Sequence, residues 1–314
     1  MQRTFLAALA LCLALQTWAC DLCGIYLNVL PHDRTHQFSL FYRMRSLSGN
    51  FTTVGSAKHG DDLPAESETA IAELFQTVEL RADLRVRQRW SVLVSVPFVN
   101  TYQRVNGLRM VDLYSMGDPL LIARYQVLNT KGGPDVQRAV HRLMIGGGVK
   151  LPLGKDDLTY RGYDVGHDLQ PGTGTWDILA TVEYALRMGR NGVAFSNVLR
   201  SNGVSSNGYR FGDGLSSTLE VFRTWTCGKA QVAPSVGAYG EFAKRDEQDG
   251  SMINSTGGNT LFSHVGARLW WRSWMLTGVW QHALINDIGS AMVPNHDRMV
   301  VGLTYMLNKN NKQQ

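Results

Sequence analysis

Much of the chain alternates between apolar and polar side chains, which is the pattern of a β-strand with one apolar face. In residues 142–154, RLMIGGGVKLPLG, the odd-numbered positions are apolar or glycine, whereas Arg142, Met144 and Lys150 lie on the opposite face. Three consecutive glycines would weaken an ordinary strand. We therefore interpret glycines 146–148 as a sharp bend of the sheet or as room for crowded interior groups. Pro152 predicts the end of the strand.

The same alternation predicts twelve strands. They are expected at residues 36–47, 70–86, 90–102, 115–128, 142–154, 174–187, 192–202, 209–225, 230–244, 261–272, 274–285 and 298–307. In the second strand Leu74, Val78 and Leu80 share one face, whereas Glu79 and Arg81 share the other. Because charged side chains are excluded from the hydrocarbon of a membrane, we expect the charged face to line a lumen and the apolar face to contact lipid.

The lengths of the connections also alternate. Long polar connections follow the first, fifth and ninth strands, at residues 48–69, 155–173 and 245–260. Medium ones follow the third, seventh and eleventh strands, the first of them at residues 103–114, and most of the others are tight. Bacterial outer-membrane barrels have short periplasmic turns and longer outer loops. We therefore predict an all-β fold: a single closed antiparallel transmembrane β-barrel of about twelve strands, with both termini in the periplasm.

The first 19 residues have the features of a secretory signal peptide. Arg3 precedes an apolar run at residues 5–15, and Ala19 supplies a small residue before the cut. This run is shorter than the roughly 20 residues of a spanning helix, and no longer apolar run follows it, which excludes a helical membrane protein. We expect four parts, namely a signal peptide (1–19), a periplasmic N-terminal segment (20–35), the barrel (36–307) and a polar tail (308–314).

Composition agrees with a barrel. Glycine supplies 32 of 314 residues, above its usual share of about 7%. Several tryptophans lie near predicted strand ends, where a membrane barrel places interfacial aromatic residues: Trp90, Trp176, Trp225, Trp270, Trp271 and Trp274.

The formal charge of +5 is mild and no basic stretch is interleaved with aromatic residues, so we expect no nucleic-acid partner. The expected partners are outer-membrane lipid and a small solute, and no cofactor is expected.

Cys20 and Cys23 form a CxxC sequence at the start of the expected mature chain. Three interpretations stay open for this pair: a short disulfide in an oxidising compartment, ligands of a soft metal ion, or a lipid-modified Cys20 beside a free Cys23. We favour the disulfide. Cys227 lies in the turn between the eighth and ninth strands and is expected to be a free thiol.

Several motifs resemble a known family. The mature start ACDLCG, followed in order by FSLFYRMRS, AELFQTVELRADLRVRQRWSVLVSVPF, MGDPLLIARYQV, GGGVKLPLGK, LQPGTGTWD and NGYRFGD, is similar to bacterial outer-membrane transporters with a CDxCG N-terminus. These are loosely similar to barrels linked with uptake of aromatic and fatty compounds. The resemblance covers nearly all of the mature chain and implies an outer-membrane transporter. Family members often begin CDxCGC, and Ile25 in place of the third cysteine weakens the metal-binding interpretation.

A set of charged residues points into the predicted lumen, and we call it the lumen set. By alternation it contains Arg43, Glu73, Glu79, Arg81, Asp118, Arg124, Lys150, Asp177, Glu183, Arg187, Glu220, Glu241 and Arg268. Because buried charges must pair and both signs are nearly balanced, the set fits a salt-bridged filling of a narrow barrel. It also fits a polar permeation path whose charges set selectivity.

The sequence thus predicts a passive outer-membrane channel or transporter for an unidentified small solute. The alternative is a non-transport surface barrel whose long loops bind a partner. An outer-membrane lipid hydrolase would need a serine, a histidine and an acid brought together by the fold. Ser263, His264 and His282 are the candidates, but no motif connects them, and we expect no enzymatic activity.

Overall fold

The fold is that of a computed structural model, which describes residues 35–54, 66–130 and 139–308. The expected signal peptide, the segment that contains Cys20 and Cys23, and nearly all of the polar tail lie outside the described residues.

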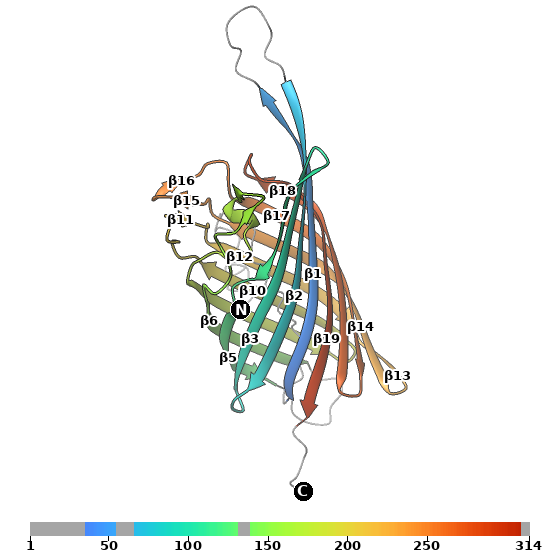
Figure 1. The fold of residues 1–314 in the computed structure, drawn as a ribbon. Coiled ribbons are helices and arrows are strands. Elements are labelled where there is room, and N and C mark those ends of the chain that lie inside the picture. Colours follow the sequence, from blue (N-terminus) through green and yellow to red (C-terminus); the bar gives the residue numbers. More distant parts are fainter. Residues whose placement is uncertain (1–34, 55–65, 131–138, 309–314) are drawn as a thin grey trace, which may run out of the picture.

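Antiparallel strands make up most of the described chain (Figure 1). Fourteen of them form one sheet. These are β1 (Thr35–Val54), β2 (Glu66–Arg85), β3 (Trp90–Val105), β4 (Leu108–Met116), β5 (Leu120–Asn129), β6 (Val140–Lys150), β9 (Asp177–Met188), β10 (Asn191–Ser201), β12 (Gly214–Arg223), β13 (Trp225–Cys227), β14 (Ala230–Ala243), β17 (Gly258–Trp271), β18 (Trp274–Ile288) and β19 (Asn295–Asn308). The connections hold β7 (Thr159–Tyr160), β8 (Tyr163–Asp164), the 3-10 helix η1 (His167–Leu169), β11 (Tyr209–Arg210), β15 (Glu247–Gln248) and β16 (Ser251–Met252).

The sheet closes on itself through the pairing of β1 with β19 and of β12 with β14. Two positions in the wall are each filled by two successive strands: β4 and β5 both pair with β3, and β12 and β13 both pair with β14. The fourteen strands of the described residues therefore occupy twelve positions, which confirms the predicted closed antiparallel barrel. No helix of the described ranges is long and apolar enough to cross a membrane.

The structure has two strands, β4 and β5, where the sequence predicts a loop at residues 103–114 and one strand at residues 115–128. That prediction is wrong. Residues 103–114 do not form a loop, because β3 and β4 make a hairpin through Asn106 and Gly107. Their φ angles of 49° and 79° suit a two-residue turn of the Asn-Gly type. β4 pairs with the second half of β3, whereas β5 pairs with its first half. Pro119, which cannot donate to a strand ladder, lies in the short connection between β4 and β5.

Most of the other predicted strands also differ in their bounds. β1 extends to Val54 and β2 begins at Glu66, so the connection predicted at residues 48–69 is shorter than expected. β6 ends at Lys150 rather than at residue 154, because Pro152 has no N–H for the ladder. β9 begins at Asp177 rather than at residue 174. The predicted strand at residues 209–225 is divided into β11, β12 and β13.

Two of the three consecutive glycines face the barrel interior and make room for the neighbouring strand. A Cβ atom on Gly146 would lie 2.8 Å from Cγ of Arg124, and one on Gly148 would lie 2.8 Å from Cγ1 of Ile122. A side chain at either position would therefore displace a buried group of β5. This supports the interpretation of the glycines as room for crowded interior groups.

The two ends of the barrel differ. Tight connections at residues 86–89, 189–190, 228–229 and 272–273 lie at one end, which we call the turn end. Residues 151–176, 202–213, 244–257 and 289–294 lie at the other, which we call the loop end.

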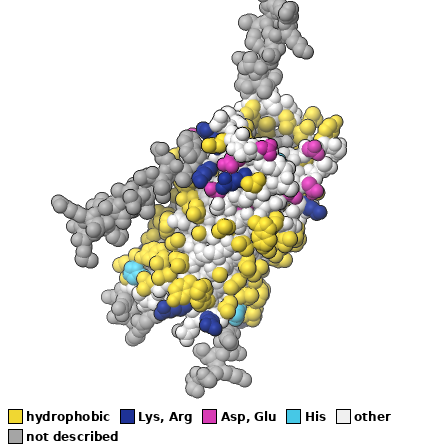
Figure 2. Space-filling model, turned by 90° about the vertical axis from the view of Figure 1, so that its left-hand side faces the viewer, with side chains coloured by type: hydrophobic (Ala, Val, Ile, Leu, Met, Phe, Trp, Pro, Cys, Tyr) yellow, Lys and Arg dark blue, Asp and Glu magenta, His cyan; other side chains and the backbone are white. Residues whose placement is uncertain are grey.

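The outer face of the barrel carries an apolar belt. Leucines, valines and isoleucines of alternate strand positions are exposed on it, and Figure 2 shows apolar side chains spread over the middle and lower part of one face. Trp90, Trp225, Trp271 and Trp274 are exposed beside the connections of the turn end. Trp270 instead points inward and is buried, so its prediction as an interfacial residue is wrong. A closed barrel with an apolar belt and an aromatic rim is an outer-membrane protein.

Candidate functional site: a charged chamber inside the barrel

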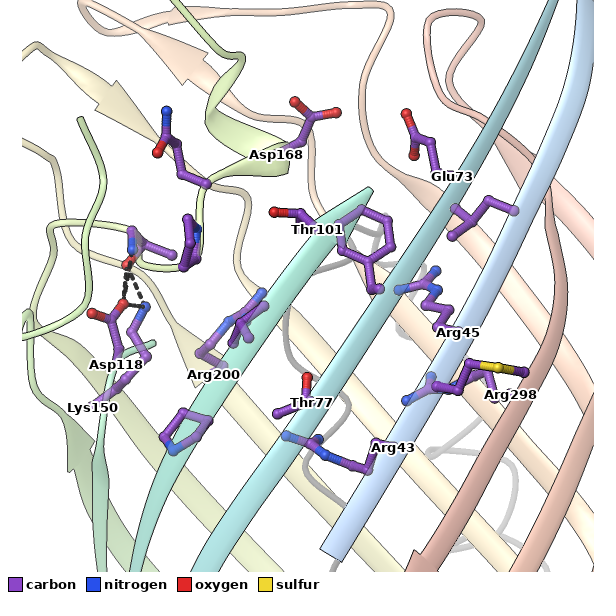
Figure 3. A pocket seen from close by; sticks show the side chains of 18 of the residues that line it. Arg43, Arg45, Glu73, Thr77, Thr101, Asp118, Lys150, Asp168, Arg200 and Arg298 are labelled. Atoms are coloured by element: carbon purple, nitrogen blue, oxygen red, sulfur yellow. Dashed lines mark hydrogen bonds and ion pairs between the residues drawn. The ribbon is translucent and has the colours of Figure 1, made fainter. Parts of the chain in front are cut away.

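A chamber lies inside the barrel toward the loop end (Figure 3). Its volume is about 340 Å³, which is within the range of small-molecule sites, about 300–1,000 Å³. The inward faces of β1, β2, β3, β5, β6, β9, β10 and β19 form its wall, and the connections of the loop end form its roof. Charged, polar and apolar side chains all line it.

The roof is a packed unit. His167 of η1 stacks on Tyr209 of β11 with the ring centroids 4.1 Å apart. The Tyr209 hydroxyl donates to Asp246 at 2.6 Å, and the backbone N–H of Gly212 donates to the same carboxylate at 2.8 Å. Asp168 also lines the chamber, and burial raises the pKa of its carboxyl above the ordinary value, with Asp246 adding to the effect. The chamber therefore has acidic groups on its roof side.

A buried group of one lysine and two aspartates holds residues 151–176 against the wall, and Figure 3 shows the lysine, Lys150, beside Asp118. Lys150 Nζ lies 3.1 Å from Asp118 and 2.6 Å from Asp177. Asp118 also accepts hydrogen bonds from the backbone N–H of Thr173 at 2.8 Å and of Gly154 at 2.9 Å. The ion pairs thus fix both ends of this connection, and with them part of the roof.

Three arginines project into the chamber from β1 and β19 (Figure 3). Arg43 lies 3.1 Å from Glu79. Arg45 lies 3.6 Å from Glu241, to which Arg298 also binds. Arg43 and Arg45 are two residues apart on β1, so both face inward, and Arg298 is the ladder partner of Arg45. Strand geometry therefore gathers the three guanidinium groups on one side of the chamber.

Further ion pairs lie in the interior toward the turn end. They are Glu79 with Arg81 (2.6 Å), Arg124 with Glu183 (3.2 Å) and with Asp83, and Glu220 with Arg268 (2.7 Å) and with His264 (3.5 Å). Most of these side chains are buried, as are Phe41, Leu93 and Ile122 between them. In such an interior the hydrogen bonds between charged groups are stronger than in water.

The lumen set lies where alternation predicts it. Arg187 is exposed at the turn end, Arg43 is half-buried, and the other members are buried. Arg43, Glu73, Asp118 and Lys150 line the chamber, and the rest lie around or below it. A role of these residues in permeation stays a prediction.

Five charged residues of the chamber are missing from the lumen set. Alternation could have found Arg45, Arg200 and Arg298, since each lies on the inward face of a strand. Asp168 and Asp246 lie in connections, where no periodicity indicates the direction of a side chain. Only the folded arrangement of the loop end brings these two carboxylates to the chamber.

The candidate hydrolase residues do not come together. The Ser263 hydroxyl donates to the backbone carbonyl of His282 on the outer face, where His282 also lies 3.0 Å from Asp297. His264 is buried on the inner face, 3.1 Å from Gln281. These three residues therefore form no triad. Within the described ranges, no group of three or more His, Cys, Asp or Glu side chains could hold a metal ion.

No family description and no curated protein sequence matches this chain. Among solved structures it is similar to the COG4313 outer membrane channel from Pseudomonas putida F1, with a TM-score of 0.63 and 13% identity over 91% of this chain and 100% of that chain. It is more distantly similar to a Pseudomonas aeruginosa FadL homologue, with a TM-score of 0.36 and 10% identity over 89% and 91% of the two chains. For the CymD monoaromatic hydrocarbon channel the TM-score is 0.32 and the identity 8%, over 90% of each chain. The first similarity shows a shared outer-membrane barrel fold.

Proposed function

We propose that this protein is a passive outer-membrane channel for a small solute, and that the chamber receives the solute from the loop end. The observation that carries the proposal is the chamber itself, a cavity of about 340 Å³ inside a closed barrel. A barrel that only displays loops needs no internal cavity. A channel needs a place where a solute can leave bulk water and exchange its hydrogen bonds for those of the wall. The shared fold with an outer membrane channel agrees with this function.

We propose that the ion pairs below the chamber form the selective constriction. Arginine and glutamate side chains have many rotamers, so a passing solute can displace them without disturbing the strand ladders. Their charges would favour some solutes over others. In this proposal the lumen set is the permeation path. The further proposal that the chain is a transporter of the CDxCG type rests on the sequence resemblance.

We also propose that the loop end faces the outside of the cell, with both termini in the periplasm. Outer-membrane barrels place their longer connections outside. An epitope tag in the turn at Gly162 or at Gly250 should be reachable on intact cells, and a tag after Gln314 should not. Protection of both loop tags would refute this orientation.

Conductance tests the channel function. The purified full-length protein should give discrete current steps in planar bilayers and should make liposomes swell in small solutes. Glu183→Gln removes a charge from the proposed constriction and should change the ratio of cation to anion permeability. Asp112→Asn removes a carboxylate from the middle of β4, where it pairs with Arg109 and does not line the chamber, and should leave that ratio unchanged. A folded wild-type protein without conductance or swelling would refute the channel and favour the surface barrel that binds a partner.

A further inference from the structure

Cationic side chains from four strands converge on the chamber. They are Arg43 and Arg45 of β1, Lys150 of β6, Arg200 of β10 and Arg298 of β19. Figure 3 shows Arg43, Arg45 and Arg298 extending from neighbouring strands into the same cavity. Four of the five are arginines, whose planar guanidinium groups match carboxylates and related anions in geometry as well as in charge.

Positive charge is concentrated on the β1 and β19 side of the chamber. Glu79 is shared between Arg43 and Arg81, and Glu241 is shared between Arg45 and Arg298. Every one of these arginines has a carboxylate partner, yet each carboxylate serves two of them. Four guanidinium groups therefore gather around two carboxylates on this side of the barrel. Lys150 is different, because two aspartates flank it.

Apolar surface lies directly beside these arginines. Phe75 of β2 is the ladder partner of Arg45, and Val300 of β19 is the ladder partner of Arg43. Both line the chamber, together with Val293 of the connection before β19. A ligand whose charged group meets the arginines can therefore place an apolar body against these side chains in the same cavity.

The roof side of the chamber carries the opposite charge. Glu73 and Asp168 lie together on that side of the cavity in Figure 3. Glu73 is two residues from Phe75 on β2, which places it about 7 Å further toward the loop end. Carboxylates at the roof and guanidinium groups deeper in the chamber would orient an anion with its charged group away from the roof.

We propose that the chamber binds a small organic anion with an apolar body, such as a carboxylate or sulfonate. Its anionic group accepts hydrogen bonds from Arg45 and Arg298, and its apolar body lies against Phe75 and Val300. As a statement of substrate class, this rests on the proposed channel function. The physical reason is that a carboxylate or sulfonate matches the gathered guanidinium groups in charge and geometry, while its apolar body leaves water.

A matched pair of probes tests the inference. 4-Phenylbutyrate and 4-phenylbutyramide have nearly the same size and shape and differ by one negative charge. Isothermal titration of the full-length protein in detergent micelles should show that the carboxylate binds at least tenfold more tightly than the amide. Arg45→Gln removes one guanidinium, and Thr77→Glu adds a carboxylate opposite Arg43. Both variants should weaken binding of the carboxylate at least tenfold and leave the amide unchanged.

Arg104→Gln is the control, because Arg104 lies on the outer face over Tyr102, and it should leave both affinities unchanged. Heat-modifiable migration in gels establishes that each variant is folded. Equal affinity of the wild-type protein for the two probes would overturn the inference, even if the variants fail to fold. Conductance without this discrimination would leave the channel proposal standing alone. Discrimination without conductance would show a binding site in a protein that is not a channel.

Discussion

Leu80→Arg tests the placement of the barrel in the membrane. Leu80 lies on the outer face of β2, 52% exposed, and is the ladder partner of Val96 on β3. Val96 is six residues from Trp90 at the turn end, or about 20 Å along the strand. With a strand tilt of about 45° this is about 14 Å along the membrane normal, close to the middle of an apolar band about 25 Å tall. An arginine there should lower the free energy of unfolding by about 2–4 kcal/mol.

Two matched variants separate depth from charge. Val86→Arg places the same charge outside the barrel at the turn end and should cost about 0–1 kcal/mol. Thr77→Arg points into the chamber rather than into lipid and should cost less than Leu80→Arg. The measurement is equilibrium unfolding by denaturant of protein folded in lipid vesicles, followed by tryptophan fluorescence. Equal losses in all three variants would refute the register of β2 and the faces assigned to it.

Three further predictions concern packing, pH and the exposed thiol. Gly302→Ala would place a Cβ 2.2 Å from the Phe41 ring and should cost about 1–3 kcal/mol in the same unfolding assay, whereas Gly278→Ala, with no atom within 4 Å, should be nearly neutral. Burial raises the pKa of Asp168, so protonation favours the folded protein and the stability it brings is lost as pH rises through the raised pKa. Asp168→Asn should therefore raise the melting temperature at pH 7, and the difference from wild type should shrink toward pH 4; a constant difference would contradict the argument. Cys227 is exposed in β13 and should react with maleimide without reduction, and a disulfide that contains it would contradict the free thiol.

The strand pattern was predictable from sequence because the backbone fixes it. Successive side chains of a strand point to opposite faces, so Leu80 and Arg81 must separate into lipid and lumen once a barrel forms. The hairpin at Asn106 and Gly107 was also within reach, since Asn-Gly is a strong signal for a two-residue turn. The sequence prediction misses this hairpin because it assigns residues 103–114 to a loop.

The roof of the chamber was not predictable in this way. Asp246 meets Tyr209 across 37 positions of sequence, and His167 stacks on the same ring. These contacts join separate connections, each of which lacks a regular period. Their arrangement depends on how the closed barrel places the connections, so no local pattern indicates that Asp168 and Asp246 line one cavity.

Alternation indicates which charges face the lumen, but closure of the barrel decides which of them pair. Arg43 and Arg45 are neighbours on the inner face of β1, yet Arg43 binds Glu79 on the adjacent β2 and Arg45 binds Glu241 on β14. β14 is separated from β1 by three strands of the sheet, so the second pair crosses the interior. Arg43 and Arg45 therefore have different structural roles, although they belong to the same alternating pattern. The first pair holds two neighbouring strands, and the second links distant walls at the level of the chamber, where a bound anion would compete for it.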